Sequence, residues 1–588
     1  MTSKKTENTT APKRNELTNE KISNKKASPT KANVLKTKAN AHKGNANNAN
    51  LNKDNASKSS VSKGNSKVDV NKGKASDISL DKINNKPTKA ETAAEMARTA
   101  LTNPNGEKFF TIKTYGCQMN VYDSEQLQKI ATSLGFKQID DYDDAHLVII
   151  NTCHIREKAT EKMYSEIGRI GRKKIAMAKK GERMIIVIVG CVAQAEGEVI
   201  FKRSPFVDIV LGAESYHELP DMITKLCNSG EPQINIDFNP SKKFDFLEGE
   251  EDATINKLNS ELSLSGNDNG ENGFADGAVG SGATPRHSKP SEFVTIQEGC
   301  DKFCTFCVVP YTRGAEFSRG VESIIKEITR LAQSGTKEVV LLGQNVNAFH
   351  GVDANGKSWS LAQLIAKVAE IDGIERIRYT TSHPNNVTND LIAIHGAEPK
   401  LMPALNLPVQ SGSNKVLKAM NRNHTYDEFV AIVKKLKMVR PELIMSSDFI
   451  VGFPTETDED FEDTMKLVEE VGFCLQSFSF KYSPRAGTPA ANKTQISSAV
   501  QSQRLAKLQA LLDKQRLDFN KTFEGKEVSI LFDNLNLRRK NEIGGRTEFM
   551  QIAIVETENE DEKASLYGSI RRAKVIKVNA NSLHCKLV

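Results

Sequence analysis

The sequence predicts an α/β protein with an N-terminal open parallel α/β domain, a central partial (β/α)6 barrel, a small C-terminal β-barrel and a disordered N-terminal arm. Three observations lead to this fold class. With 588 residues the chain is too long for one hydrophobic core. Strand and helix patterns alternate along two separate stretches, as in parallel sheets covered by helices. The last stretch, roughly 60 residues, alternates as strands.

Residues 1–105 form the predicted disordered arm. They are rich in Lys, Asn, Ser, Ala and Thr, and have too few large apolar side chains to offset the chain entropy of folding. The first 100 residues hold 21 Lys and Arg against 9 Asp and Glu, although the whole chain carries only +7. The arm is therefore either a basic segment that attracts RNA weakly or a solvated tail.

Residues 106–239 are predicted to form the N-terminal α/β domain. Apolar runs predict strands over 109–115, 146–150, 184–189 and 208–211, and a helix pattern covers 124–134. Residues 240–291 are rich in Gly, Asn, Ser, Asp and Glu, and this composition predicts a flexible linker.

Residues 292–522 are predicted to form the partial barrel. Six strands are expected, over 293–297, 338–342, 376–381, 404–408, 444–451 and 478–482. Helix patterns lie between them, for example over 361–371 and 426–438, and right-handed crossovers would curl such units into a barrel. A closing helix has one apolar face, made by Leu505, Leu508, Leu512 and Phe519. In the predicted C-terminal β-barrel, over 523–588, the pairs Gly544-Gly545 and Tyr567-Gly568 indicate turns.

The chain has nine cysteines, and it shows neither a secretory signal nor an apolar run of about 18 residues. Reduced thiols are therefore expected, as metal ligands or in catalysis. Cys300, Cys304 and Cys307 lie close together on a loop after a predicted strand. Three such thiolates can hold one face of a cubane iron–sulfur cluster and leave the fourth iron open to a ligand. The alternative is a structural zinc site, but no fourth ligand lies nearby in the sequence.

Three further cysteines each follow one of the first three strands of the N-terminal domain. These are Cys117, Cys153 and Cys191. The carboxyl ends of parallel strands lie along one edge of a sheet, so these thiols are expected to converge on a shared metal site. The alternative is that they are three separate buried core cysteines. Cys227, Cys474 and Cys585 show no such pattern and are expected to be structural.

The cysteine loop matches the CxxxCxxC motif of the radical S-adenosylmethionine superfamily, with Phe306 as its aromatic residue before the third cysteine. From about 108 to 588 the chain resembles the methylthiotransferase family of that superfamily. The segments that carry the resemblance are YGCQMN (115–120), NTCHIR (151–156), GCVAQ (190–194), GCDKFCTFCVVPYTRG (299–314), LNLPVQSGS (405–413) and DFIVGFP (448–454). Thr455 departs from the family, in which glycine is common after this last segment.

The resemblance implies two 4Fe–4S clusters and S-adenosylmethionine as cofactors. Cys300, Cys304 and Cys307 would hold the radical cluster, and Cys117, Cys153 and Cys191 an auxiliary cluster whose open iron carries the sulfur to be delivered. One S-adenosylmethionine would methylate that sulfur, and a second would yield a 5′-deoxyadenosyl radical. Contacts with the cofactor are expected from Phe306, and from Gln344, Asn345 and Ser382 at the ends of barrel strands.

Within the family the chain resembles most the branch that adds a methylthio group to C2 of N6-isopentenyladenosine beside the anticodon of tRNA. The alternatives are methylthiolation of N6-threonylcarbamoyladenosine in tRNA or of a ribosomal protein. A non-enzymatic RNA-binding protein with structural clusters is a further alternative, although structural sites are normally closed. Partners would be tRNA, an electron donor and a sulfur source, and a cytoplasmic monomer without membrane contact is expected.

The C-terminal module resembles the TRAM domain, which binds RNA. RNA contacts in it are expected from basic and aromatic side chains, which are Arg538, Arg539, Lys540, Arg546, Phe549, Arg571 and Arg572. The alternative for the basic runs 538–540 and 571–572 is an ordinary solvated turn.

Overall fold

The computed structural model describes residues 106–154, 157–238, 243–244, 289–535, 537, 539–579 and 581–588, all of them within one compact unit of the chain. The predicted arm (1–105), most of the predicted linker (240–291) and Arg538 lie outside the described residues. In the described part of the chain, no helix combines the length and the apolar character needed to span a membrane.

The N-terminal domain contains a six-stranded sheet in which all neighbouring strands are parallel. Its order is β2-β1-β3-β4-β5-β6. The strands are β1 (Lys108–Tyr115), β2 (Phe136–Gln138), β3 (Leu147–Thr152), β4 (Ile185–Val189), β5 (Ile209–Leu211) and β6 (Gln233–Asn235). The four predicted strands are confirmed. The two that the sequence missed, β2 and β6, are three-residue edge strands, and most of their side chains are not buried.

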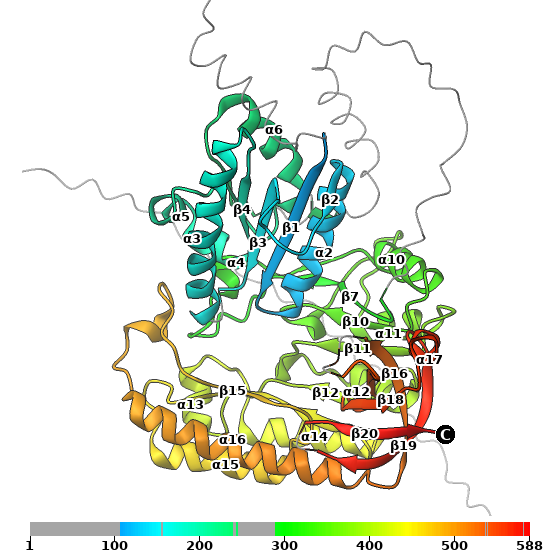
Figure 1. Cartoon of the computed structure of the whole chain (residues 1–588). Helices are drawn as coiled ribbons and strands as arrows, with labels where there is room; N and C mark the ends of the chain where they lie inside the picture. The colour runs from blue at the N-terminus through cyan, green and yellow to red at the C-terminus, as the bar shows by residue number, and fades with distance from the viewer. Residues whose placement is uncertain are drawn as a thin grey trace, which may run out of the picture. The chain divides into compact units, whose positions relative to one another are not determined.

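Helices cover both faces of this sheet (Figure 1). One face packs against α2 (Gln118–Ser133) and α6 (Leu219–Ser229). The other packs against α3 (Glu157–Lys179), α4 (Cys191–Glu196) and α5 (Val199–Arg203). Every residue of β3 and β4 is buried, and for this reason these strands are continuous apolar runs without alternation.

The central domain is the predicted partial barrel of parallel strands. They are β7 (Ser291–Thr295), β10 (Glu338–Leu342), β11 (Arg376–Thr380), β12 (Ala404–Asn406), β13 (Ile444–Ser446), β14 (Asp448–Val451) and β15 (Phe478–Lys481). The prediction of one strand over 444–451 is wrong in detail, because Ser447 separates β13 from β14. The Ser447 hydroxyl replaces the backbone ladder there: it accepts from Val409 N at 2.8 Å and donates to Leu407 O at 2.9 Å.

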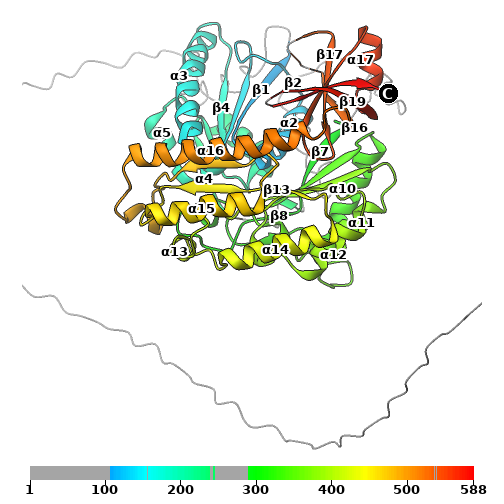
Figure 2. The same ribbon diagram turned by 90° about the horizontal axis from the view of Figure 1, so that it is seen from below.

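An outer layer of helices packs on the barrel strands (Figure 2). The helices are α10 (Val321–Gln333), α11 (Leu361–Ala369), α12 (Asn389–Ala397), α13 (Asn414–Ala419), α14 (Tyr426–Val439), α15 (Asp458–Val471) and α16 (Ser498–Lys521). Reciprocal capping boxes begin α11, α14 and α15, at Ser360, Thr425 and Thr457. In α16, Leu508 and Leu512 are buried in the barrel core, as the apolar pattern predicts.

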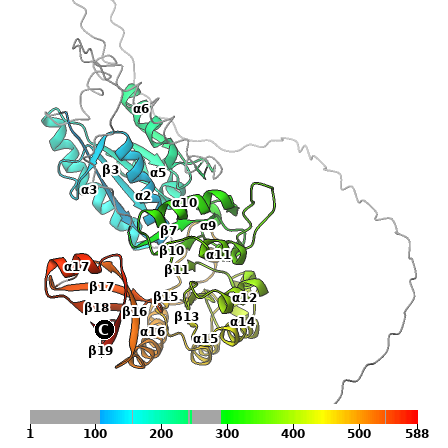
Figure 3. The same ribbon diagram turned by 90° about the vertical axis from the view of Figure 1, so that its right-hand side faces the viewer.

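The C-terminal domain is a closed five-stranded barrel of order β16-β17-β18-β20-β19 (Figure 3). Its elements are β16 (Glu527–Asn534), β17 (Glu542–Thr547), β18 (Ile552–Glu556), α17 (Glu560–Leu566), β19 (Ile570–Val578) and β20 (Leu583–Leu587). The predicted turn at Gly568 is confirmed by its positive φ of 80°. The turn predicted at Gly544-Gly545 is wrong, since both residues lie inside β17. A Cβ at Gly545 would collide with the backbone of Leu531, so glycine there allows the strands of this small barrel to approach closely.

Two arginines of β11 join the central strands to the C-terminal barrel. Arg376 donates to Arg546 O at 2.8 Å and to Ser529 O at 2.9 Å. Arg378 donates to backbone carbonyls of Glu548 and Thr547, and its Nε donates to Glu338 at 2.8 Å. Backbone acceptors and one buried carboxylate therefore satisfy both guanidinium groups.

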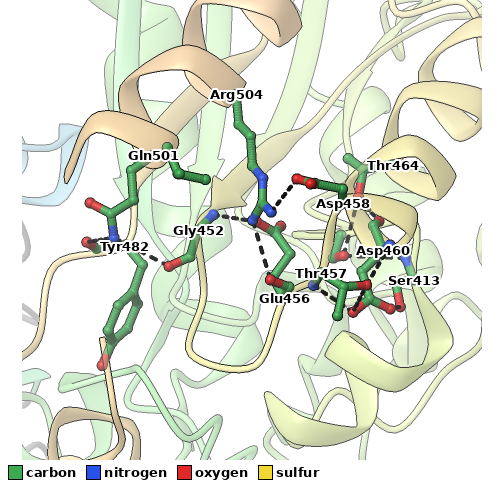
Figure 4. A network of polar contacts seen from close by, with 12 residues as sticks. Ser413, Gly452, Glu456, Thr457, Asp458, Asp460, Thr464, Tyr482, Gln501 and Arg504 are labelled. Carbon is green, nitrogen blue, oxygen red and sulfur yellow. Dashed lines mark hydrogen bonds and ion pairs between the residues drawn. The ribbon is translucent and has the colours of Figure 1, made fainter. Parts of the chain in front are cut away.

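A polar network fixes the turn that follows β14 (Figure 4). The carboxylate of Glu456 accepts from Gly452 N and from Arg504 of α16, both at 2.6 Å. Gln501 donates to the carbonyl of Gly452 at 3.2 Å. Within this turn Thr455 has φ of 83°, the left-handed conformation that favours glycine. The departure from the family that the sequence shows at Thr455 therefore falls at a strained position.

Replacing Thr455 by glycine should stabilise the protein by about 1 kcal/mol, because relief of the strain exceeds the extra flexibility of glycine in the unfolded chain. The side chain is exposed, so no packing is lost. A thermal unfolding scan would measure the gain. Thr455→Ala retains the Cβ and should show no such gain, and an equal gain in both variants would contradict the explanation by strain.

Candidate metal and cofactor site

The loop with three clustered cysteines begins directly after β8 (Gln297–Glu298) and ends in α9 (Val309–Thr312). Its first residue, Gly299, has φ of 73°, and a Cβ there would collide with the carbonyl group of Ala315. Gly299 N donates to the Gln344 side chain at 2.6 Å. The amide of Gln297 donates to the carbonyl of Gly299 at 2.8 Å and its oxygen accepts from Asn345 N at 3.0 Å. Hydrogen bonds from the segment directly after β10, which contains Gln344 and Asn345, thus fix the start of the loop.

The thiols of Cys300, Cys304 and Cys307 lie near one another within this loop. Burial is the main cause that raises the pKa of Cys300 to about 11 and that of Cys307 to about 12, and the neighbouring thiols of the trio contribute to both shifts. The guanidinium of Arg422 lies 3.8 Å from the sulfur of Cys304 and also donates to the carbonyl of Pro408. The raised pKa values favour the thiol form of Cys300 and Cys307, so cluster assembly would release their protons.

The three N-terminal cysteines lie near one another: Cys117 shares a hydrogen bond with Cys153 and interacts electrostatically with Cys191. A Cβ at Gly116 would collide with Cys153, and one at Gly190 would crowd the Asn151 side chain, so the two glycines let the strand ends approach. A hydrogen bond with Cys153 and the nearby charge of Arg313 lower the pKa of Cys117 to about 6 against the effect of burial. A thiolate is the form that binds iron. Beside these thiols the side-chain amide of Asn120 donates to Asn151 Oδ1 at 2.9 Å, and the amide of Asn151 donates to the backbone carbonyl of Asn120 at 2.9 Å.

Arg313 joins the two groups of cysteines. This side chain, only 2% exposed, lies six residues after Cys307, and its Nε donates to the sulfur of Cys191 at 3.5 Å. Its other nitrogens contact Asp123 of α2 at 2.7 Å and Glu298 of β8 at 3.3 Å. One planar guanidinium therefore contacts a cysteine and a carboxylate of the N-terminal domain and a carboxylate of the barrel.

Lys243 completes this buried ion network. It forms ion pairs with Asp123, at 3.3 Å, and with Glu298, so that two acidic and two basic side chains balance. Its ammonium also donates to the carbonyl of Ala213 at 3.2 Å and lies 4.6 Å from the ring centre of Tyr216. Lys243 and its neighbour Phe244 belong to the predicted flexible linker, yet both are buried. For these two residues the linker prediction is wrong, because the ammonium of Lys243 pairs with two buried carboxylates inside the fold.

A neutral acid lies at the margin of the network. Burial, together with the negative charge of Glu298, raises the pKa of Glu214 to about 8. The raised pKa favours the neutral form of Glu214, which adds no negative charge to the four charges of the network.

Two of the residues predicted to contact the cofactor carry a buried polar atom without a hydrogen-bond partner, Asn345 Oδ1 and Ser382 Oγ. Two residues that the sequence did not single out as cofactor contacts carry one as well, His383 Nε2 and Arg422 Nε. Unpaired buried polar atoms are costly, so this group fits a polar ligand. Phe306 is half-buried and packs against a small apolar cluster that includes Met420 and Phe453. Gln344, in contrast, uses its side-chain oxygen to hold Gly299.

Each cysteine trio offers thiols only, which is the donor set of a cubane cluster. In the described part of the chain, no three His, Cys, Asp or Glu side chains are arranged to hold one metal ion. The ligands of one zinc ion all lie about 2 Å from the same point. The ligands of a cubane bind different irons and lie further apart, and each trio offers thiols only. The assignment of the six cysteines as ligands stays a prediction that this geometry favours.

The structure places two of the predicted RNA-contacting residues, Arg546 and Phe549, in contacts within the protein. Arg546 donates to Asp533 at 2.7 Å, and Phe549 packs edge-on against Phe519, with ring centres 5.8 Å apart. Arg572 forms an ion pair with Glu527 at 2.8 Å but stays exposed, and Arg539, Lys540 and Arg571 are exposed as well. These four basic residues remain the available candidates.

Comparisons with known proteins agree with this geometry. Residues 109–212 match the model of the Uncharacterized protein family UPF0004, and residues 294–468 match that of the Radical SAM superfamily. The chain is 48% identical to the tRNA-2-methylthio-N(6)-dimethylallyladenosine synthase of Wolbachia pipientis subsp. Culex pipiens over 473 residues, which cover 80% of this chain and 98% of the relative. The same figures hold for the synthase of Rickettsia felis over 474 residues.

The chain belongs to the radical S-adenosylmethionine methylthiotransferase family. Among solved structures, the radical S-adenosylmethionine methyltransferase TsrM from Kitasatospora setae has a TM-score of 0.43 at 12% identity, covering 65% of this chain and 77% of that one. Membership of the radical SAM superfamily implies S-adenosylmethionine and a 4Fe–4S cluster. The CxxxCxxC loop of this methylthiotransferase provides the residues that would hold that cluster.

Replacing Lys243 by methionine should destabilise the methylthiotransferase by about 3 kcal/mol or more, because Asp123 and Glu298 would then share one buried cation. Thermal unfolding and limited proteolysis would measure the loss. Lys367→Met is the matched control, since Lys367 pairs with Glu370 at the surface and should change little. Adding Glu298→Gln to Lys243→Met restores the charge balance and should recover part of the stability. No recovery in the double variant would contradict the role of charge.

Proposed function

We propose that this protein adds a methylthio group to C2 of N6-isopentenyladenosine next to the anticodon of tRNA. The observation that carries the proposal is the second cysteine trio beside the radical loop: Arg313, within the loop segment, contacts Cys191 at 3.5 Å. A radical cluster alone would suffice to remove a hydrogen atom, whereas delivering sulfur requires a second site that holds it. The substrate is taken from the relatives, which are named as synthases of that modified tRNA nucleoside.

In this proposal Cys300, Cys304 and Cys307 hold the radical cluster, and Cys117, Cys153 and Cys191 hold a second 4Fe–4S cluster. The clusters, when bound, supply the electron that cleaves S-adenosylmethionine and the iron that carries the sulfur. The orphaned oxygens of Asn345 and Ser382 and the Arg422 side chain would bind the polar parts of S-adenosylmethionine. Arg313 would keep both cysteine groups in a fixed relation.

The atoms of the reaction balance with two molecules of S-adenosylmethionine. One gives its methyl group to the sulfur and leaves as S-adenosylhomocysteine. The other takes one electron and splits into methionine and a 5′-deoxyadenosyl radical, which removes the C2 hydrogen and becomes 5′-deoxyadenosine. The C2 radical would then form a C–S bond with the methylated sulfur, and the one electron released in that step would pass to the bound clusters, so that no net electron is consumed in a turnover. Because this C–H bond is unactivated, no acid or base in the site could start the reaction.

The proposed enzyme needs an external electron donor and a sulfur source. We propose that it is a cytoplasmic monomer. Its proposed domains cover residues 106–239, 292–522 and 523–588. Exposed basic residues of the C-terminal barrel, such as Arg571 and Lys540, would contact tRNA phosphates.

Anaerobic turnover tests the function. The reconstituted protein, S-adenosylmethionine and a reductant are mixed with tRNA that carries isopentenyladenosine, and the digested nucleosides are weighed by mass spectrometry. We expect the mass of a methylthio group to be added to that nucleoside. If 5′-deoxyadenosine forms while the nucleoside stays unchanged, the substrate is wrong, and tRNA with threonylcarbamoyladenosine and then the ribosomal protein are the next substrates to test.

Two single variants separate the roles of the cysteine trios. Cys304→Ala should abolish formation of 5′-deoxyadenosine, because the radical cluster would lose a ligand. Cys153→Ala should still form 5′-deoxyadenosine but should lose methylthiolation. Continued 5′-deoxyadenosine production by Cys304→Ala would overturn the first assignment, and normal methylthiolation by Cys153→Ala the second. Iron content of both variants provides a readout independent of activity, and Cys474→Ala is a matched control outside both trios.

A further inference from the structure

A buried arginine lies against one sulfur of each cysteine trio. Arg313 Nε donates to the sulfur of Cys191 at 3.5 Å, and Arg422 Nη1 lies 3.8 Å from the sulfur of Cys304. The two arginine side chains are 2% and 6% exposed. Because sulfur is a large atom, the first distance is that of an ordinary hydrogen bond, whereas the second is that of a weaker contact.

The position of Arg313 is fixed at all three nitrogens of its guanidinium. Nη2 donates to Asp123 at 2.7 Å and Nη1 to Glu298 at 3.3 Å, while Nε donates to Cys191. A planar group held at three points cannot rotate away from the sulfur without breaking a buried ion pair. The fold itself therefore fixes the hydrogen-bond donor to Cys191.

Arg422 lacks this fixation. Its Nε has no hydrogen-bond partner in the described part of the chain, and its Nη2 donates to a backbone carbonyl, that of Pro408. Its guanidinium can therefore adapt to a ligand, in line with the role in binding S-adenosylmethionine proposed above. Of the two arginines, Arg313 makes the fixed and shorter contact with a cysteine.

The charges around Arg313 cancel, but its hydrogen bond to Cys191 remains. Lys243 pairs with the same two carboxylates as Arg313, so the four buried charges sum to zero. Groups further away feel little of the Arg313 charge, because opposite charges at similar distances offset each other. Cys191 is in direct contact with the N–H donor. The effect of Arg313 should thus be local to the N-terminal trio.

A hydrogen bond to a sulfur ligand raises the reduction potential of an iron–sulfur cluster. The reduced cluster carries one more negative charge than the oxidised cluster, partly on its thiolate sulfurs, and an N–H donor stabilises that charge. The donor on Cys191 therefore makes a cluster held by the N-terminal trio easier to reduce. This property suits a cluster that accepts an electron.

We propose that Arg313 sets the reduction potential of the auxiliary cluster and so makes the N-terminal trio the electron acceptor of the reaction. The inference rests on the proposed function. There, one electron is consumed when S-adenosylmethionine is cleaved. Joining the C2 radical to the methylated sulfur forms one C–S bond and releases one electron again. The raised potential favours its transfer to the N-terminal trio. Arg313 acts through Cys191 and is in this sense a positioning residue.

A potentiometric measurement on the reconstituted full chain tests this role. In a triple variant with Cys300→Ala, Cys304→Ala and Cys307→Ala, only the N-terminal trio is left to hold a cluster, and electron paramagnetic resonance reports its midpoint potential. Adding Arg313→Met with Asp123→Asn removes the donor and one charge of each sign. We expect reduction of the cluster to become about tenfold less favourable, which is a fall of about 59 mV for one electron.

The matched control is Lys243→Met with Glu298→Gln in the same triple variant. This pair also removes one buried charge of each sign, but it keeps the contact of Arg313 with Cys191. The reduction equilibrium should change by less than about twofold. Equal shifts in the two pairs, or no shift in either, would overturn the role of Arg313.

A spectroscopic measurement that leaves Arg313 in place guards against misfolding of these variants. The triple variant is produced with arginine that carries 15N at Nε, and the reduced cluster is examined for a hyperfine coupling to that nucleus. We expect a coupling through the hydrogen bond, and its loss in Arg313→Lys, which keeps the positive charge. A reduced cluster without any coupling to arginine would contradict the inference.

Two further outcomes separate this inference from the proposed function. If the triple variant binds no iron, the N-terminal trio holds no cluster, and the role of Arg313 falls with it. Failure of the unaltered protein to methylthiolate isopentenyladenosine would instead refute the proposed function, while the measured shift in potential would still stand. Normal methylthiolation without any shift in potential would overturn the role of Arg313 and leave the function intact.

Discussion

The fold depends on the balance of four buried charges. Arg313 and Lys243 lie against Asp123 and Glu298, all at most 2% exposed. Charges taken out of water persist only if each has a partner in good geometry, and removing one leaves the others uncompensated. The four residues come from α2, the segment before the barrel, β8 and the cysteine loop. Because each charge requires its buried partners, these ion pairs fix the N-terminal domain to the barrel at the place where the two cysteine groups meet.

The position of that meeting point follows from parallel sheets. Each cysteine of the N-terminal trio lies at the carboxyl end of a strand or directly after it, and all such ends lie along one edge. The barrel obeys the same rule, because its cysteine loop comes after the carboxyl end of the parallel strand β7, with only the two-residue strand β8 between them. Glycine makes the approach close enough: Gly116 and Gly190 occupy positions that a Cβ would block. The hydrogen bond from Arg313 to Cys191 then connects the two edges.

Much of this could be predicted from the sequence, for local reasons. Fully apolar runs identify β3 and β4, and cysteine spacing identifies the loop, since both signals lie in adjacent residues. Pairings that depend on distant residues could not be predicted: Asp123 and Arg313 are 190 positions apart. The burial of Lys243 could not be predicted, because the segment around it has the composition of a linker. The two buried carboxylates that pair with Lys243, those of Asp123 and Glu298, explain its burial. The prediction of a turn at Gly544-Gly545 was wrong because glycine occurs where strands pack closely as well as in turns.

An incomplete barrel has an exposed last strand, and exposed edges with apolar side chains invite aggregation. The chain removes this risk at its first strands, where Met119 and Tyr122 of α2 cover Val340 and Leu342. At β15 the apolar surface stays open, since Phe478 is 45% and Phe480 is 44% exposed. A radical reaction needs a dry site once the substrate is bound, but an open one before.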